Sequence, residues 1–132
     1  NVIGAYRAWF TVDERDVAEA HIRMLESVNV QNGERYIAWS TETRNVEDVC
    51  ASIDRLLPEL GFAGAELIDP LPESVQAREA QFRAIWGGCD LRNDRICDTL
   101  GMAFRPLDVS IRDCVETLIS VGGVEPVRRP GF

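Results

Sequence analysis

The stretch FTVDERDVAEAHIRMLE, residues 10–26, decides the fold because a strand passes directly into a helix within it. From Tyr6 to Asp13 the chain is rich in aromatic and β-branched residues, which predicts a strand. Asp13 then begins a helix that we expect to run from Glu14 to about Val28. The helical spacing of its apolar residues predicts one buried face, formed by Val17, Ala18, His21, Met24, Leu25 and Val28.

A second strand and a second helix follow this unit. RYIAWS, from Arg35 to Ser40, has an almost unbroken apolar centre, which is typical of a strand covered on both faces by helices. The next helix runs from Val46 to Leu60, and Asn45 and Asp48 have the spacing of a capping box at its start. The order predicts an α/β fold that is mostly helical, with two main strands. Two strands leave pairing groups open at their edges, so we expect a larger, mostly parallel sheet completed by residues outside this sequence.

The rest of the chain reads as short helices joined by turns. Glu66-Leu67-Ile68 is a candidate edge strand, and Pro72 begins a helix whose apolar stripe includes Phe82 and Trp86. Gly101 ends a short helix from Asn93 to Leu100, and Asp108 caps a last helix that runs to about Val121. We therefore expect one folded portion, residues 1–121, and an extended tail, residues 122–132.

Composition excludes several classes of partner. The net charge of −8 disfavours nucleic acid and anionic membranes, since both attract clustered cations. The sequence contains no apolar tract of about 18 residues. The four cysteines form no C-x-x-C pair, which predicts no metal site and reduced thiols in a cytoplasmic protein, with Cys50 and Cys114 buried on helix faces. All fourteen basic residues are arginines, so the chain offers no lysine amine.

Candidate catalytic groups are few. His21, the only histidine, lies on the apolar face of its helix, which favours a packed ring over a catalytic base. Asp13, Glu14 and Asp16 begin the same helix, where negative charge is stabilised by free amides, so we interpret them as a structural cap. The segment GFAG, residues 61–64, follows a helix instead of a strand and reads as a helix stop, not a phosphate cradle. The sequence thus predicts no catalytic residue in this chain.

Three blocks in order resemble one enzyme family. FTVDERDVAEAHIRMLE resembles F-V-D-V-R-D-V-A-x-A-H of the extended short-chain dehydrogenases/reductases, the NAD-dependent epimerase/dehydratase superfamily, especially its dihydroflavonol-reductase-like branch. NGERYIAWSTETRNVEDVCASIDRLLPELG, residues 32–61, is similar to the family's G-x-R-Y strand and following helix. RNDRICDTLGMAFRPLDVSIRDCVETLI, residues 92–119, is similar to D-N-S-K-x-x-x-x-L-G-x-x-x-R-P, although Asp94 and Arg95 replace its Ser and Lys.

The resemblance implies that this chain is the C-terminal, substrate-side portion of a Rossmann-type enzyme. The family's glycine-rich turn, catalytic Ser and Tyr-x-x-x-Lys pair would precede Asn1, and neither Tyr6 nor Tyr36 has a lysine four residues later. NAD or NADP would then be bound by the missing N-terminal half, encoded in the same gene or a separate chain. The chain alone would be inactive, without cofactor-binding or metal-binding residues, and the parent enzyme would be a homodimer.

The resemblance also implies where the substrate lies. The first strand borders the substrate cleft in the family, which nominates Arg7, Trp9 and Phe10 as substrate-binding residues; a solvated or ion-paired arginine and two core aromatics are the alternatives. The implied function is an NAD(P)-dependent oxidoreductase that reduces or oxidises a small carbonyl or alcohol substrate. Two alternatives stay open: a nucleotide-sugar epimerase or dehydratase of the same family, and a stand-alone, non-catalytic binding module.

Overall fold

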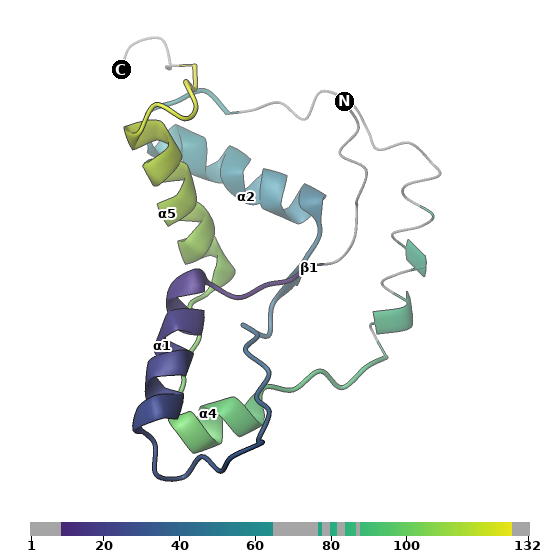
Figure 1. Cartoon of the computed structure of the whole chain (residues 1–132). Helices are drawn as coiled ribbons and strands as arrows, with labels where there is room; N and C mark the ends of the chain where they lie inside the picture. The colour runs from purple at the N-terminus through teal and green to yellow at the C-terminus, as the bar shows by residue number, and fades with distance from the viewer. Residues whose placement is uncertain (1–8, 65–76, 78–79, 82–83, 87, 128–132) are drawn as a thin grey trace.

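The computed structural model describes residues 9–64, 77, 80–81, 84–86 and 88–127. Helices dominate this part of the chain, which confirms the mostly helical prediction. Helix α2 packs against α5, α1 packs against α4, and a short ladder lies between the two helix pairs (Figure 1). The elements are β1 (Trp9–Phe10), α1 (Glu14–Glu26), β2 (Thr43–Arg44), α2 (Val46–Glu59), α4 (Asp94–Leu100) and α5 (Leu107–Ser120).

The ladder is antiparallel and short. Trp9 pairs with Arg44 and Phe10 pairs with Thr43. The prediction of a strand from Arg35 to Ser40 is wrong for the described chain, because no ladder forms over these residues. Ser40 bonds toward the first strand region, because its amide and its hydroxyl both donate to the Thr11 carbonyl at 3.0 Å. A strand needs a neighbouring strand to pair with, and the larger parallel sheet that would supply one stays a prediction.

The lower core joins α1 and α4. Its buried residues are Ala20, Ile96, Leu100 and Met102. The predicted buried face of α1 is only partly correct: Met24 packs against the lower core, but Leu25 is 88% exposed, Val28 beyond the helix is 95% exposed, and the helix buries Asp16 and Ala20. Burial of the small Ala20 side chain suits close helix packing, and the buried Asp16 carboxylate is neutralised by Arg105.

His21 is also exposed, because the side of α1 that carries it faces solvent. Its ring is exposed, and Nδ1 lies 2.7 Å from the Val17 carbonyl one turn earlier. The prediction of a histidine packed in the core is therefore wrong. A solvated ring that bonds its own helix has no partner that would make it a catalytic base.

The upper core joins α2 and α5 through Leu56, Leu57, Ile111 and Val115. The capping box that begins α2 is confirmed, since the Asp48 amide donates to Asn45 Oδ1 at 2.7 Å and the Asn45 amide donates to Asp48 Oδ2 at 3.0 Å. Gly61 and Gly101 follow their helices with φ of 83° and 65°, as helix stops require. Asp108 does not cap α5: Pro106 holds the cap position, which leaves the Asp108 carboxylate free to bond elsewhere.

Several predicted features lie outside the described residues. These are the edge strand at 66–68, the helix start at Pro72 and the tail beyond Val127. Of the predicted helix after Pro72, residues 77, 80–81 and 84–86 are helical. The Ala63 amide donates to the Val127 carbonyl at 2.8 Å, so the described start of the tail returns to the end of α2. The division at residue 121 stays a prediction.

The cysteines differ from expectation, and their exposure predicts an order of reactivity. Cys114 is exposed on α5 and Cys50 is half-buried, so neither lies in the core as predicted. Cys97 packs beside the lower core, and burial raises the pKa of its thiol. Because the thiolate is the nucleophile, brief iodoacetamide treatment at pH 7.5 should modify Cys114 well before Cys97. Peptide mass spectrometry measures both rates, and equal rates in the native chain would contradict this packing.

Candidate functional site

The structure describes two of the three predicted substrate-binding residues. Arg7 lies outside the described residues. Trp9 and Phe10 form β1, and their backbone pairs with Arg44 and Thr43 of β2. The ladder therefore brings the predicted site next to the start of α2. The polar side chains that gather there define the candidate site.

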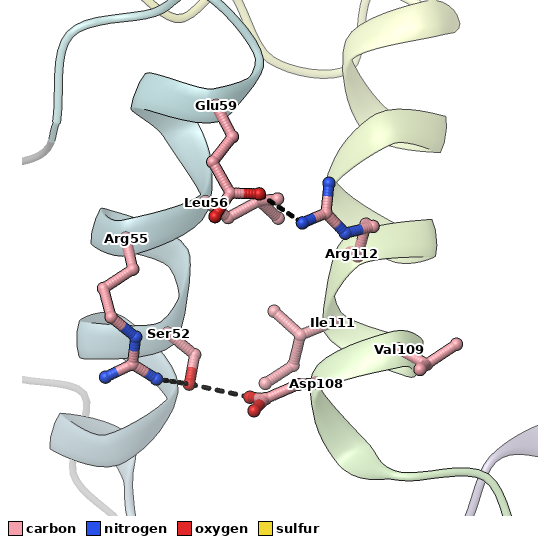
Figure 2. Close-up of a pocket in the computed structure, with 8 residues that line it drawn as sticks. All are labelled: Ser52, Arg55, Leu56, Glu59, Asp108, Val109, Ile111 and Arg112. Carbon is pink, nitrogen blue, oxygen red and sulfur yellow. Dashed lines mark hydrogen bonds and ion pairs between the residues drawn. The ribbon is translucent and has the colours of Figure 1, made fainter.

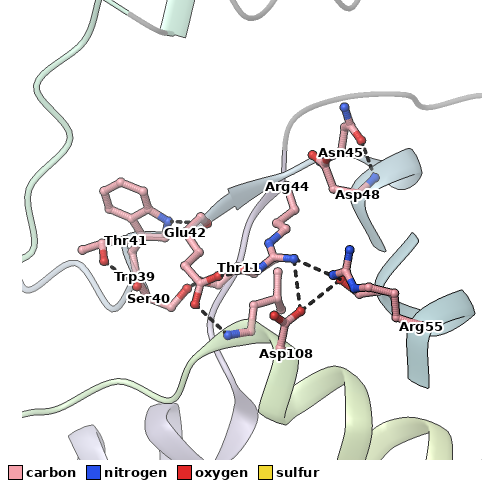
Figure 3. Close-up of polar contacts among 12 residues, drawn as sticks. Thr11, Trp39, Ser40, Thr41, Glu42, Arg44, Asn45, Asp48, Arg55 and Asp108 are labelled. Carbon is pink, nitrogen blue, oxygen red and sulfur yellow. Dashed lines mark hydrogen bonds and ion pairs between the residues drawn. The ribbon is translucent and has the colours of Figure 1, made fainter. Parts of the chain in front are cut away.

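Five side chains form one cluster at this point, which we call the arginine cluster: Glu42, Arg44, Ser52, Arg55 and Asp108. The Arg44 guanidinium donates to Ser52 Oγ at 3.0 Å, to Asp108 Oδ1 at 3.1 Å and to Glu42 Oε2 at 3.0 Å (Figure 3). Arg55 Nη2 donates to the same Ser52 oxygen at 3.0 Å. The Ser52 hydroxyl itself donates to Asp108 Oδ1 at 3.0 Å. One buried hydroxyl thus joins both arginines to a carboxylate.

The cluster is charged but locally balanced, with two arginines facing two carboxylates. Burial alone would lower the pKa of Arg44, yet the hydrogen bonds to Glu42 and Asp108 outweigh burial and raise it. Burial likewise opposes ionisation of Asp108, and the bonds from Ser52 and Arg44 still hold its pKa below the usual value. Arg44 and Asp108 therefore keep their charges at neutral pH, which suits binding and positioning and not proton transfer.

Ser52 is also poorly placed as a nucleophile. Its oxygen accepts bonds from Arg44 and Arg55, and its proton is held by the Asp108 carboxylate, whose pKa is lowered. A serine nucleophile needs a neighbouring base that can take its proton, and a carboxylate with a depressed pKa is a weak base. His21, on α1, makes no hydrogen bond to this cluster among the described residues.

Two hollows meet at Arg55. One is lined by Thr43, Arg44, Asp48, Ala51 and Arg55 at the start of α2. The other, a groove of about 220 Å³ between α2 and α5, has the buried side chains of Leu56 and Ile111 in its floor and an Arg112–Glu59 ion pair at its far end (Figure 2). Within the described part of the chain, Arg55 makes no ion pair. The pair of hollows can therefore take a small molecule with an apolar body and a polar group near Arg55.

Sequence reasoning missed the whole arginine cluster. Ser52 and Arg55 are three residues apart and so share one face of α2, and Ser52 interrupts an apolar stripe that contains Ile53 and Leu56. A hydroxyl at a position expected to be apolar was the available signal. Arg44, directly before the helix cap, gave no signal of its own, because its partner Asp108 is distant in the sequence.

A second polar group supports the start of α1. The Arg15 amide donates to Asp13 Oδ1 at 2.9 Å, and Ser110 Oγ donates to Asp13 Oδ2 at 2.6 Å. Arg15 also pairs with Asp113 of α5 at 2.6 Å. The interpretation of Asp13 as a structural cap is confirmed. These bonds, chiefly the one from the Arg15 side chain, hold the pKa of Asp13 well below its usual value.

Acid should destabilise the fold through Asp13. Because its pKa is lower in the folded than in the unfolded chain, its contribution is complete above about pH 5 and is lost as the pH falls toward the folded pKa. Asp13→Asn keeps a capping side chain but removes the titrating charge. Urea unfolding between pH 5 and pH 2.5 should therefore show a shallower loss of stability in Asp13→Asn. Identical slopes in the two proteins would assign the acid sensitivity to other carboxylates.

No group of histidine, cysteine and carboxylate side chains in the described ranges is arranged to hold a metal ion. Among the same residues, no helix has the length and apolar character needed to cross a membrane. Comparison of the chain with protein-family models, with curated proteins and with solved structures finds no match.

Proposed function

We propose that this chain is the substrate-side portion of an NAD(P)-dependent oxidoreductase of the extended short-chain dehydrogenase/reductase type, acting on a small carbonyl or alcohol substrate. The proposal rests on the three sequence blocks, and one structural observation supports it. Motif residues from different blocks, distant in the sequence, contact one another in the fold.

The first of these contacts joins the first and third blocks. Asp16, the second aspartate of V-D-E-R-D, has a fully buried side chain. Its Oδ2 accepts a hydrogen bond from the Arg105 amide at 2.8 Å, and its Oδ1 pairs with the Arg105 guanidinium. Arg105 is the arginine of the R-P motif. Loss of either residue would leave its partner without a counter-charge, so the two motif positions are expected to occur together.

The second set of contacts joins the second and third blocks. Asn93 Nδ2 donates to the Trp39 carbonyl at 2.6 Å. The guanidinium of Arg95 lies 5.1 Å from the centre of the Tyr36 ring, which is the tyrosine of the G-x-R-Y motif. A planar cation over an aromatic face is a favourable contact that lysine makes less well, so the Arg95 replacement is compatible with the block.

Charge balance in the arginine cluster favours a neutral substrate. Arg44 is neutralised by Glu42 and Asp108, which leaves Arg55 as the one cation of the cluster without an ion pair among the described side chains. A nucleotide sugar carries a diphosphate, which needs several unpaired donors. A small carbonyl compound needs only one or two. The cluster therefore supports the reductase over the nucleotide-sugar alternative, with Arg7, Trp9 and Phe10 as the proposed substrate contacts.

The described residues do not fit a dinucleotide site. Such a site needs a glycine turn between a strand and a helix N-terminus, whereas Gly61 and Gly64 follow the end of α2. Under the proposal, the dinucleotide is held by a separate nucleotide-binding portion. The four unpaired thiols agree with the cytoplasmic location that we propose for the enzyme.

Two titrations test this proposal. Calorimetry of the chain with NADH and NADPH should show no saturable binding at micromolar concentrations. In an NMR titration, small aldehydes and ketones should shift the amides of Trp9, Phe10 and Arg44. Arg55→Gln should weaken that response, whereas Arg92→Gln, which changes an exposed arginine outside both hollows, should leave it unchanged. Micromolar binding of either dinucleotide, or carbonyl-induced shifts confined to α1 and α4, would contradict the proposal.

A non-catalytic binding module is the second candidate, and the outer face of α1 favours it. Ile22 is 55% exposed on the same face as Leu25, so an apolar stripe lies in solvent opposite the buried Ala20. Such stripes mark interaction surfaces. If carbonyl compounds cause no shifts and the chain forms a larger species with a partner protein, the chain would have this function instead.

A further inference from the structure

The segment from Arg35 to Ala38 has the side-chain alternation of a strand. Tyr36 and Ala38 are half-buried and pack against the lower core. Arg35 lies before them and Ile37 between them. Both side chains are exposed, and that of Ile37 is 66% exposed. Residues two apart share one side only in an extended chain. The segment is thus strand-like in its side chains although it lies in no ladder.

Its backbone is anchored at the ends and open in the middle. The Trp39 carbonyl accepts from Asn93, and the next amide, that of Ser40, donates to Thr11. Between these anchors, the amides and carbonyls of Tyr36, Ile37 and Ala38 make no hydrogen bond within the described chain. Among the described residues, these three consecutive residues therefore have backbone donors and acceptors without partners.

This edge also lacks the usual protection. Exposed strand edges are normally blocked by proline, lysine, a bulge or a covering element, because free backbone groups recruit other strands. The sequence ERYIAW, residues 34–39, contains no proline or glycine and is rich in aromatic and β-branched residues. A segment of this composition is a good acceptor for strand pairing.

We propose that residues 35–39 bind an extended strand of a partner polypeptide by β-strand addition. Backbone pairing would supply the affinity, and the exposed side chains would supply the selectivity. Arg35 makes no ion pair within the described chain, so the fitting strand carries an acidic residue beside Arg35 and an apolar residue beside Ile37. A second copy of this chain fits poorly, because each copy has a net charge of −8. The proposal goes beyond the enzymatic one, and its test involves neither cofactor nor carbonyl.

A peptide titration tests strand addition in the whole chain. The probe is a fluorescein-labelled octapeptide of alternating valine and threonine with an aspartate near one end, followed by fluorescence anisotropy. We expect saturable binding with Kd below about 1 mM. Hydrogen exchange should slow at the amides of residues 36–38 when the peptide is bound. Ile37→Pro, which removes one amide donor, should weaken binding at least about tenfold, and the control Ile37→Thr should stay within about threefold.

Charge reversal keeps the test decisive if Ile37→Pro does not fold. Arg35→Glu should bind the aspartate peptide more weakly than the wild type and a matched lysine peptide more tightly. Absence of wild-type binding up to 1 mM, unchanged exchange at residues 36–38, or equal preference of Arg35→Glu for both peptides would overturn the proposal. Concentration-dependent dimers that exclude the peptide would overturn it in favour of self-pairing. A failed carbonyl titration would not affect any of these outcomes.

Discussion

Ile96→Ala is expected to lower the free energy of unfolding by about 2 to 5 kcal/mol. Ile96 is 1% exposed and belongs to the lower core, where α4 meets α1. Removal of its outer carbons leaves a cavity between two helices that are already joined through small side chains such as Ala20. The lost burial and the cavity both contribute to the cost. Urea unfolding followed by circular dichroism measures it.

Leu25→Ala is the control for this prediction. The substitution also shortens an aliphatic side chain, on α1, but Leu25 is 88% exposed, so we expect a change within about 0.5 kcal/mol. The pair of variants also tests the rotation of α1. If Leu25→Ala were as costly as Ile96→Ala, the face predicted from the apolar pattern would be the buried one after all.

The elements of this fold were largely predictable because their local signals agree. Asp13 caps α1 and the Asn45–Asp48 box begins α2, as their side-chain spacing indicated. Gly61 and Gly101 end the helices before them. Each of these signals acts over a few residues through hydrogen bonds or backbone freedom. Such effects can be read from the sequence without knowledge of the distant parts of the chain.

Tertiary contacts were less predictable. The pattern of α1 has more than one apolar stripe. Its buried face includes Asp16, a charged residue, and a prediction from apolar spacing places charged residues in solvent. Its partner Arg105 is 89 residues away, so no local rule could find the pair. The arginine cluster was missed for the same reason, since it joins Arg44 to Asp108 on α5.

The segment RYIAWS shows the opposite failure, in which a strong local signal lacks its tertiary partner. Its composition predicts a strand, and Tyr36 and Ala38 do turn to one side as in a strand. Pairing, however, requires a neighbouring backbone, and the described chain places none beside residues 36–38. Intrinsic β-propensity reports how well side chains fit a sheet, and it cannot supply the second strand.

Asp16→Asn should have an effect of similar size to Ile96→Ala, about 3 to 5 kcal/mol in unfolding free energy. The Asp16 side chain is fully buried, whereas the Arg105 side chain is 35% exposed. Loss of the carboxylate leaves the guanidinium partly desolvated without its counter-charge. In the variant, the side-chain oxygen at position 16 can still accept from the backbone N–H of Arg105, but the new NH2 group then faces the guanidinium, so the charge and one hydrogen bond are lost together. Thermal and urea unfolding at pH 7 measure the cost.

Asp113→Asn is the matched control, because it removes the same charge from an exposed pair. Arg15 and Asp113 have side chains 44% and 41% exposed, and solvent screening limits such pairs to about 1 kcal/mol or less. The double variant Asp16→Asn with Arg105→Gln should recover part of the loss, since it removes the unpaired cation as well. If Asp16→Asn costs no more than Asp113→Asn, the pair does not determine which face of α1 is buried. The contact between the first and third sequence blocks would then lose its support for the proposed enzyme.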